Sequence, residues 1–203
     1  MNTELAKNIE ESYEIMFRVQ TSGRSESLNP QYCNYEGTPY FALNYLTSHT
    51  NLFRHPINLV DFGSGKGRLL FYFNDCCPGV YTGVEYDPVL FDCSLKNLHS
   101  YEQYFRHRIN LIHEKAEKYS IRSDQDVFYF FNPFSLKIFM KVYIHIIESY
   151  QTHPRKITLL FFSPAEEYIR FLSTLSIFSS ITMLPVESPY KDKKDFFMIY
   201  QIG

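Results

Sequence analysis

The sequence predicts an α/β protein: a doubly wound, mostly parallel sheet of seven strands, with an N-terminal helical extension and an antiparallel last strand. Two observations support this prediction. Short apolar runs alternate with segments of helical periodicity from residue 57 onward, which is the pattern of βαβ units. A glycine-rich loop joins the first of these runs to a helix, as at the ligand-binding edge of such sheets.

The elements follow in order along the chain. Apolar residues at helical spacing predict a first helix over 3–19, and after a long polar loop Pro39 begins a second helix over 40–47. Strand-length apolar runs follow at 57–62, 80–85, 109–112, 126–131, 156–162, 177–184 and 196–202, with helical segments at 68–73, 88–98, 136–150 and 166–175. Only the polar segment 186–195 joins the last two strands, so we expect them to pair antiparallel at one edge.

Composition narrows the class of protein. The formal charge of −2 over 203 residues argues against a general polyanion binder and against direct DNA binding. No apolar run approaches the roughly 18 residues of a membrane span, and the first residues lack the pattern of a secretory signal. The cysteines at 33, 76, 77 and 93 form no CxxC pair, so we expect reduced thiols in a cytoplasmic protein without a metal site.

The glycine loop reads Asp61-Phe62-Gly63-Ser64-Gly65-Lys66-Gly67-Arg68. It is not a P-loop, because Lys66 is followed by glycine rather than by serine or threonine. It is not a complete dinucleotide fingerprint either, because Arg68 stands where the third glycine of GxGxxG belongs. A carboxylate two residues before the first glycine favours a ligand that carries an ammonium group over a bare anion.

Three motifs together resemble the class I S-adenosylmethionine-dependent methyltransferases: V-D-F-G-S-G-K-G-R at 60–68, G-V-E-Y at 83–86 and F-F-N-P-F at 130–134. The resemblance implies a Rossmann-like methyltransferase fold, S-adenosyl-L-methionine as cofactor and S-adenosyl-L-homocysteine as product. It divides one structural domain into N-terminal helices with a cofactor-covering loop, 1–50, and a methyltransferase core, 51–203.

The same resemblance assigns roles to single residues. Asp61 would hold the ammonium end of the methionine moiety, and Glu85 the ribose hydroxyls, with Tyr86 beside the adenine. Gly63 and Gly65 would lie under the methionine and ribose, and Ser64 and Gly67 of the same loop would also bind the cofactor. The acid that the family often places after the third strand corresponds here to Lys115 or is displaced to Glu114.

The corner Asn132-Pro133-Phe134 resembles the N-P-P-Y element of amino-group methyltransferases, with one proline instead of two. There the Asn side chain and the following carbonyl accept hydrogens from the nitrogen to be methylated. The resemblance therefore makes these three residues the candidate catalytic set, and it implies that Asn132 also contacts the cofactor. Tyr35 and Thr38 resemble the cofactor-covering Y-x-x-T segment of disruptor-of-telomeric-silencing-type lysine methyltransferases. An ammonium acceptor would need a base, for which Glu36 and Tyr35 are candidates.

The sequence therefore predicts a methyltransferase acting on a nitrogen of a protein side chain or small molecule, with RNA left open as an acceptor and no membrane partner. A non-catalytic S-adenosylmethionine-binding module is the alternative, followed by an NAD-dependent oxidoreductase. Aromatic residues make up 18% of the chain. Most should pack the sheet, while the rings of Tyr35, Tyr40, Tyr86, Phe131 and Phe134 should lie beside the cofactor and acceptor sites.

Overall fold

The fold is one seven-stranded sheet with helices on both faces. The computed structural model describes residues 3–27, 29–187, 189 and 194–203. The strands lie in the order β3-β2-β1-β4-β5-β7-β6; the first five are parallel to one another, and β7 is antiparallel to both β5 and β6. The predicted fold class and the antiparallel last strand are confirmed. The strands are β1 Ile57–Phe62, β2 Gly79–Glu85, β3 Ile109–His113, β4 Val127–Phe130, β5 Ile157–Phe162, β6 Ser180–Val186 and β7 Asp195–Ile202.

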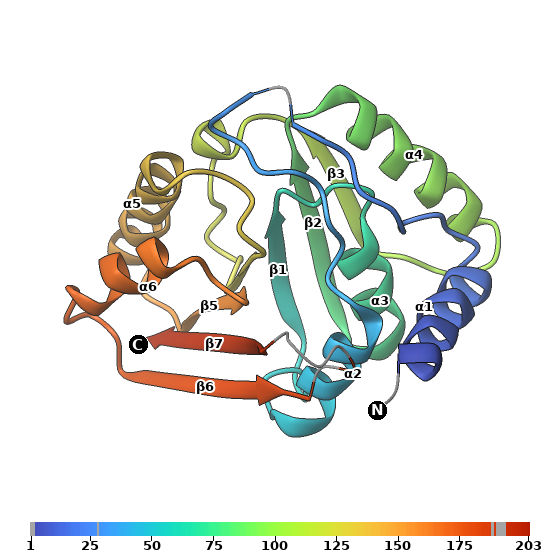
Figure 1. Cartoon of the computed structure of the whole chain (residues 1–203). Coiled ribbons are helices and arrows are strands. Elements are labelled where there is room, and N and C mark those ends of the chain that lie inside the picture. Colours follow the sequence, from blue (N-terminus) through green and yellow to red (C-terminus); the bar gives the residue numbers. More distant parts are fainter. Residues whose placement is uncertain (1–2, 28, 188, 190–193) are drawn as a thin grey trace.

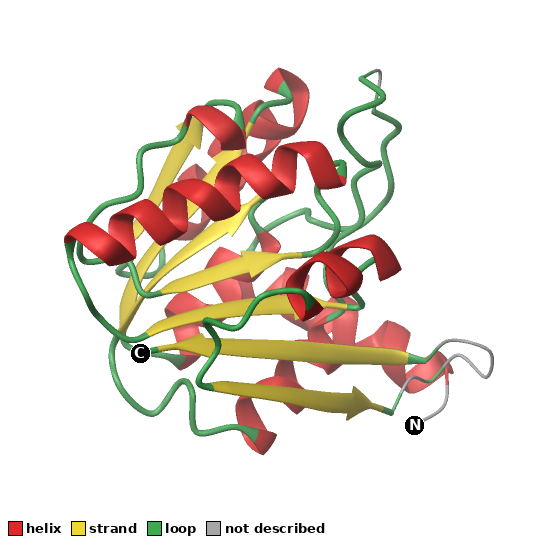
Figure 2. Ribbon diagram, turned by 90° about the vertical axis from the view of Figure 1, so that its left-hand side faces the viewer, coloured by secondary structure: helices red, strands yellow, loops and turns green. Residues whose placement is uncertain are grey.

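The helices form two layers around this sheet. They are α1 Thr3–Phe17, α2 Tyr40–His49, α3 Arg68–Cys76, α4 Pro88–Glu102, α5 Leu136–Thr152 and α6 Glu166–Ser173, with a short 3₁₀ turn η1 at Ala116–Lys118. Helices α5 and α6 lie on one side of the sheet and α1, α3 and α4 on the other (Figure 1). Seen from the side of α5, the strands lie side by side between these layers (Figure 2). Among the described residues, no helix is long and apolar enough to cross a membrane.

Alternation along the strands gives each face its own core. On β1, Leu59 packs into the cluster formed with α1, α2 and α3, while its neighbour Val60 packs into the cluster formed with α5 and α6. This period of two is what a strand with both faces buried requires. Rings fill much of both clusters, so most of the aromatic excess is core, as expected.

A substitution at Phe139 tests how much the cluster formed with α5 and α6 contributes to stability. The ring of Phe139 is completely buried and stacks on Tyr168 with 4.3 Å between centroids. We expect Phe139→Ala to lower the free energy of unfolding by roughly 3–5 kcal/mol, because the change leaves a cavity in a packed core. Urea unfolding measures this, and Met140→Ala, one residue along the same helix but 39% exposed, should change it by less than about 0.5 kcal/mol.

The structure corrects one strand. The sixth was expected over 177–184, but β6 begins at Ser180. The two apolar residues before it, Ile177 and Phe178, pack against the α5–α6 cluster from a loop, and Phe178 lies 4.9 Å from the ring of Tyr200. Their hydrophobicity reflects burial without strand pairing. Half of the joining segment predicted at 186–195, residues 188 and 190–193, lies outside the described residues.

A long loop, residues 18–39, described apart from residue 28, connects α1 to α2. We call it the covering loop. It crosses the carboxyl ends of β1 and β2 (Figure 1), which is where open α/β sheets bind ligands. Its backbone pairs with the opposite rim, since Tyr32 and Phe134 form an antiparallel bridge.

Candidate functional site

A cavity of about 70 Å³ lies under the covering loop, at the carboxyl ends of β1, β2 and β4. Typical ligand pockets measure roughly 300–1,000 Å³, so a nucleoside-sized ligand needs the covering loop to move. The predicted residues that line the cavity are Tyr35, Thr38, Asp61, Gly63, Ser64, Glu85, Tyr86, Pro133 and Phe134. Gly65, Gly67 and Asn132 are not in its lining.

The glycine loop allows close packing at two points. Gly63 has φ +76°, and a Cβ there would overlap the side chain of Pro133. Gly65 has φ +54°, and a Cβ there would overlap the ring of Tyr35. Only glycine combines this backbone conformation with such close neighbours. The glycine loop therefore meets both the N-P-F corner and the covering loop.

Asp61, the second-last residue of β1, presents a buried carboxyl group to the cavity. Within the described residues, neither a backbone nor a side-chain donor bonds to it. Burial, together with the nearby charge of Glu85, raises the pKa of Asp61 to about 8. A buried acid without a donor is stabilised by a cation placed beside it.

Ser64 adds a second unused polar group. Its side chain is 6% exposed, and its Oγ has no hydrogen-bond partner among the described residues. Buried polar atoms in native proteins are nearly always paired. Ser64 and Asp61 both line the same cavity, so the site has an acceptor and a hydroxyl ready for a polar ligand.

Glu85, the last residue of β2, is held in place by backbone donors. Its Oε2 accepts from the N–H of Gly65 at 2.8 Å and its Oε1 from the N–H of Asp87 at 2.8 Å. Burial raises the pKa of Glu85, and these backbone hydrogen bonds oppose the rise. A carboxylate has about four acceptor positions, so Glu85 can still accept hydrogens from ligand hydroxyls.

The covering loop closes over Tyr86, which follows Glu85. The rings of Tyr32 and Tyr86 stack with 3.6 Å between centroids, and the hydroxyls of Tyr86 and Ser27 are 3.0 Å apart. Tyr32 also donates to Glu117 Oε2 at 3.0 Å, and burial raises the pKa of this tyrosine. Tyr32 was not among the predicted site residues, although an aromatic side chain inside a mostly polar loop was a signal for it.

Tyr35 and Thr38 lie on the inner side of the covering loop. The Tyr35 hydroxyl donates to the carbonyl of Thr21 at 2.6 Å, and the hydroxyls of Thr38 and Tyr129 are 2.5 Å apart. Burial raises the pKa of Tyr35, so its phenol keeps its proton and the base role considered for it is not supported. Glu36, the other candidate base, lines the cavity and pairs with Arg24 at 2.9 Å.

Asn132, in the N-P-F corner, directs its amide away from the cavity. The residue has φ +45°; its Nδ2 donates to the carbonyl of Ser163 at 2.8 Å and its Oδ1 accepts from the N–H of Ala165 at 2.7 Å. The next carbonyl, that of Pro133, accepts from the N–H of Cys33 at 3.1 Å. Both acceptors that the resemblance assigns to a substrate nitrogen thus have partners within the chain.

Of the other aromatic residues predicted at the site, some line the cavity and one does not. Phe131 and Phe134 line the cavity, although Phe134 is 98% buried. Tyr40 was expected at the site and does not line the cavity; its ring lies 4.6 Å from the guanidinium of Arg68 instead. Glu114 lines the cavity at the end of β3, so of the two positions considered for an acid there, 114 is the one at the site.

No protein-family model and no curated protein matches the chain, but solved structures do. The human methyltransferase 10 domain containing protein is 12% identical with a TM-score of 0.64, covering 97% of this chain and 96% of its own. A methyltransferase from Pyrococcus furiosus is 12% identical with a TM-score of 0.63, covering 97% and 95%. Magnesium protoporphyrin IX methyltransferase from Synechocystis PCC 6803, with bound S-adenosylmethionine, is 13% identical with a TM-score of 0.55, covering 80% and 76%. The chain therefore has the fold of the class I S-adenosylmethionine-dependent methyltransferases.

Proposed function

We propose that this protein is an S-adenosylmethionine-dependent methyltransferase. The observation that carries the proposal is the buried carboxyl of Asp61, which has no hydrogen-bond donor among the described residues and faces a covered cavity at the switch point of the sheet. S-adenosylmethionine carries an ammonium and a sulfonium, so it matches a cavity lined by Asp61 and Glu85. A structurally similar protein, the Synechocystis methyltransferase, holds this cofactor, which supports the same ligand here.

The residues present fit the cofactor. Asp61 would accept from the methionine ammonium, and the Ser64 hydroxyl, which has no partner among the described residues, lines the same cavity. Glu85, fixed by two backbone donors, would accept from the ribose hydroxyls. Tyr86 and Glu114 line the cavity beyond Glu85 and would contact the adenine, once Tyr32 leaves the face of Tyr86.

The cofactor supplies an activated methyl group, so the chain's residues mainly orient and desolvate. The covering loop lies over the cavity (Figure 1) and would exclude water from it. On the acceptor side, Pro133, Phe131 and Phe134 form an apolar wall, which favours a planar or cationic group. We propose a nitrogen of a protein side chain or small molecule as acceptor; its contact with Asn132 requires this amide to leave Ser163 or Ala165.

One observation favours a second candidate, a module that binds the cofactor without turnover. Asn132 and the Pro133 carbonyl are already bonded to Ser163, Ala165 and Cys33. If these bonds persist with ligand bound, the Asn132 amide stays turned away from the cavity and does not face an acceptor nitrogen there. The two candidates share the cofactor and differ only in transfer.

Calorimetry and a transfer assay separate these candidates. We expect S-adenosylmethionine and S-adenosylhomocysteine to bind and NAD, the control ligand, not to bind. Label from methyl-labelled S-adenosylmethionine should then enter the protein or small-molecule fraction of a cell extract, in a form that survives alkali, because N-methyl groups resist the hydrolysis that releases methyl esters. Binding without incorporation would establish the binding module, and absence of binding would overturn both candidates.

A further inference from the structure

Arg68 is the last residue of the glycine loop and the first residue of α3, and its side chain is only 6% exposed. An arginine is always charged, so burying it is costly unless its donors and its charge are matched. Arg68 therefore connects the candidate cofactor site to the residues that accept hydrogen bonds from its guanidinium. These residues belong to segments far earlier in the chain.

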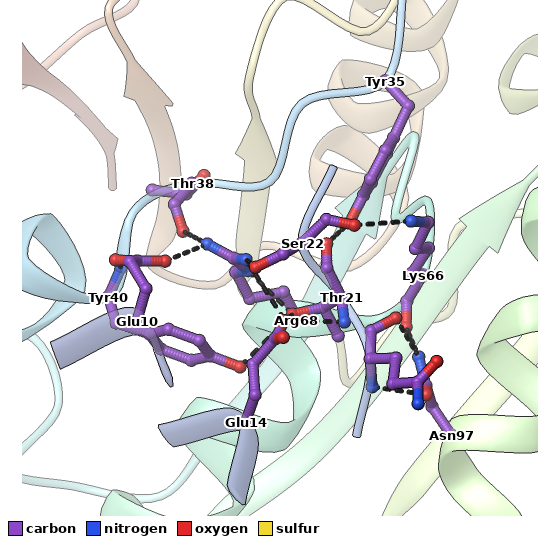
Figure 3. A network of polar contacts seen from close by, with 11 residues as sticks. Glu10, Glu14, Thr21, Ser22, Tyr35, Thr38, Tyr40, Lys66, Arg68 and Asn97 are labelled. Atoms are coloured by element: carbon purple, nitrogen blue, oxygen red, sulfur yellow. Dashed lines mark hydrogen bonds and ion pairs between the residues drawn. The ribbon is translucent and has the colours of Figure 1, made fainter. Parts of the chain in front are cut away.

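All five N–H donors of the guanidinium have acceptors. Two carboxylates come from α1 and three oxygens come from the covering loop, as the dashed lines in Figure 3 show. The acceptors are Oε2 of Glu10, Oε1 of Glu14 at 3.5 Å, Oγ1 of Thr21 at 2.8 Å, Oγ of Ser22 at 3.0 Å and the carbonyl of Thr38 at 3.4 Å.

These loop acceptors lie at opposite ends of the covering loop. Thr21 and Ser22 follow its beginning, while Thr38 precedes its end. Gly37 also lies against the guanidinium, since a Cβ there would come within 2.9 Å of Arg68 Nε. One side chain therefore holds the points at which the covering loop leaves the body of the protein and returns to it.

The glycine loop makes further bonds to the first of these ends. Lys66 Nζ donates to the carbonyl of Ser22 at 2.6 Å. The side chain of Asn97 bridges Gln20 and Lys66, accepting from the Gln20 N–H at 2.9 Å and donating to the Lys66 carbonyl at 3.0 Å. Figure 3 shows this second path beside the guanidinium. A displacement of the glycine loop would therefore be transmitted to the covering loop.

We propose that Arg68 is a positioning residue that fixes both ends of the covering loop to the glycine loop and so sets how tightly a cofactor is held. The proposal rests on the proposed function for its ligand, and on contacts within the chain for its mechanism. Lysine cannot replace arginine here: it keeps the charge near Glu10 and Glu14 but has three donors on one atom, which cannot reach both ends.

Hydrogen exchange of the ligand-free protein tests the positioning directly. In Arg68→Lys we expect exchange at least tenfold faster at Thr21, Cys33 and Tyr35, whose N–H groups donate to Glu14, Pro133 and Ser25. Amides of α5 and β5 should not change. In the same variant, the Kd for S-adenosylhomocysteine should rise at least tenfold.

Arg155→Lys is the matched control. Arg155 also uses all its donors, on the oxygens of Arg122, Gln125, Ser149 and His153 near the start of β5, far from the covering loop in sequence. This variant should leave the exchange of the covering loop and the Kd unchanged. Unchanged loop exchange in folded Arg68→Lys, or equal acceleration in both variants, would overturn the proposal.

Two milder variants serve if Arg68→Lys does not fold. Ser22→Ala removes one bond at the first end, and Gly37→Ala crowds the guanidinium at the second, with Glu10 and Glu14 still paired. Each should accelerate exchange in the covering loop, and failure of both to do so would also contradict the proposal. Should the wild type bind no S-adenosylhomocysteine, the proposed function fails while the exchange data still decide the role of Arg68.

Discussion

Replacing Asp61 by asparagine should stabilise the ligand-free protein and abolish tight cofactor binding. The pKa of Asp61 is raised to about 8 in the folded chain, against roughly 3.9 in an unfolded one. Between these two pKa values the folded state keeps a proton that the unfolded state has lost. The free energy of unfolding of the wild type therefore falls by roughly 1.4 kcal/mol per pH unit as the pH rises. Above pH 8 this decrease ends. Because a buried amide itself costs roughly 1–3 kcal/mol, we expect Asp61→Asn to be more stable by roughly 2–4 kcal/mol at pH 8. Urea unfolding at pH 5 and pH 8 measures the difference, which should nearly vanish at the lower pH.

The same substitution should raise the Kd for S-adenosylhomocysteine roughly 100-fold, or about 2.7 kcal/mol, because the ammonium loses its buried counter-charge. In the wild type, affinity should increase as pH rises toward 8, since binding needs Asp61 ionised. Asp124→Asn is the control: Arg122 lowers the pKa of Asp124, so this change should reduce stability slightly and leave binding intact. Equal affinities for wild type and Asp61→Asn would remove Asp61 from the binding site.

Gly63→Ala should lower the free energy of unfolding by roughly 3 kcal/mol. Alanine in the left-handed conformation costs about 1–2 kcal/mol, and the new Cβ would overlap Pro133, adding a typical overpacking cost of about 1–3 kcal/mol. Gly23→Ala separates the two contributions, because Gly23 has φ +92° but its nearest neighbour is Lys66 Nζ at 3.7 Å. If urea unfolding showed the same loss of stability in both variants, the contact between the glycine loop and the N-P-F corner would contribute nothing to the free energy of unfolding.

The fold was predictable because its signals are local. The strand β1 ends at Phe62 and the helix α3 begins at Arg68, as expected, since a buried apolar run, a glycine turn and helical periodicity each occupy a few adjacent residues. The predicted start of β6 was wrong because Ile177 and Phe178 are buried without belonging to a strand. A loop residue that covers a core looks, in sequence, like a strand residue.

The site was predictable only in part. Asp61 and Glu85 follow from their places at strand ends, and both line the cavity. The partners of Asn132 could not be derived, because Ser163 and Ala165 are more than 30 residues away and contact it only through the packing of β4 beside β5. The stacking of Tyr32 on Tyr86, across 54 positions of sequence, depends likewise on the path of the covering loop.

The covering loop touches both halves of the site, which has a kinetic consequence. Through Tyr32 it lies on Tyr86, and through the N–H of Cys33 and the carbonyl of Gln31 it bonds to Pro133 and Ser135. If the proposed transfer takes place at this site, one opening would uncover the cofactor and acceptor sides together, and exchange of spent cofactor and release of methylated product would become a single gated event. The frequency of that opening would then set the upper limit on turnover, however fast the transfer itself is.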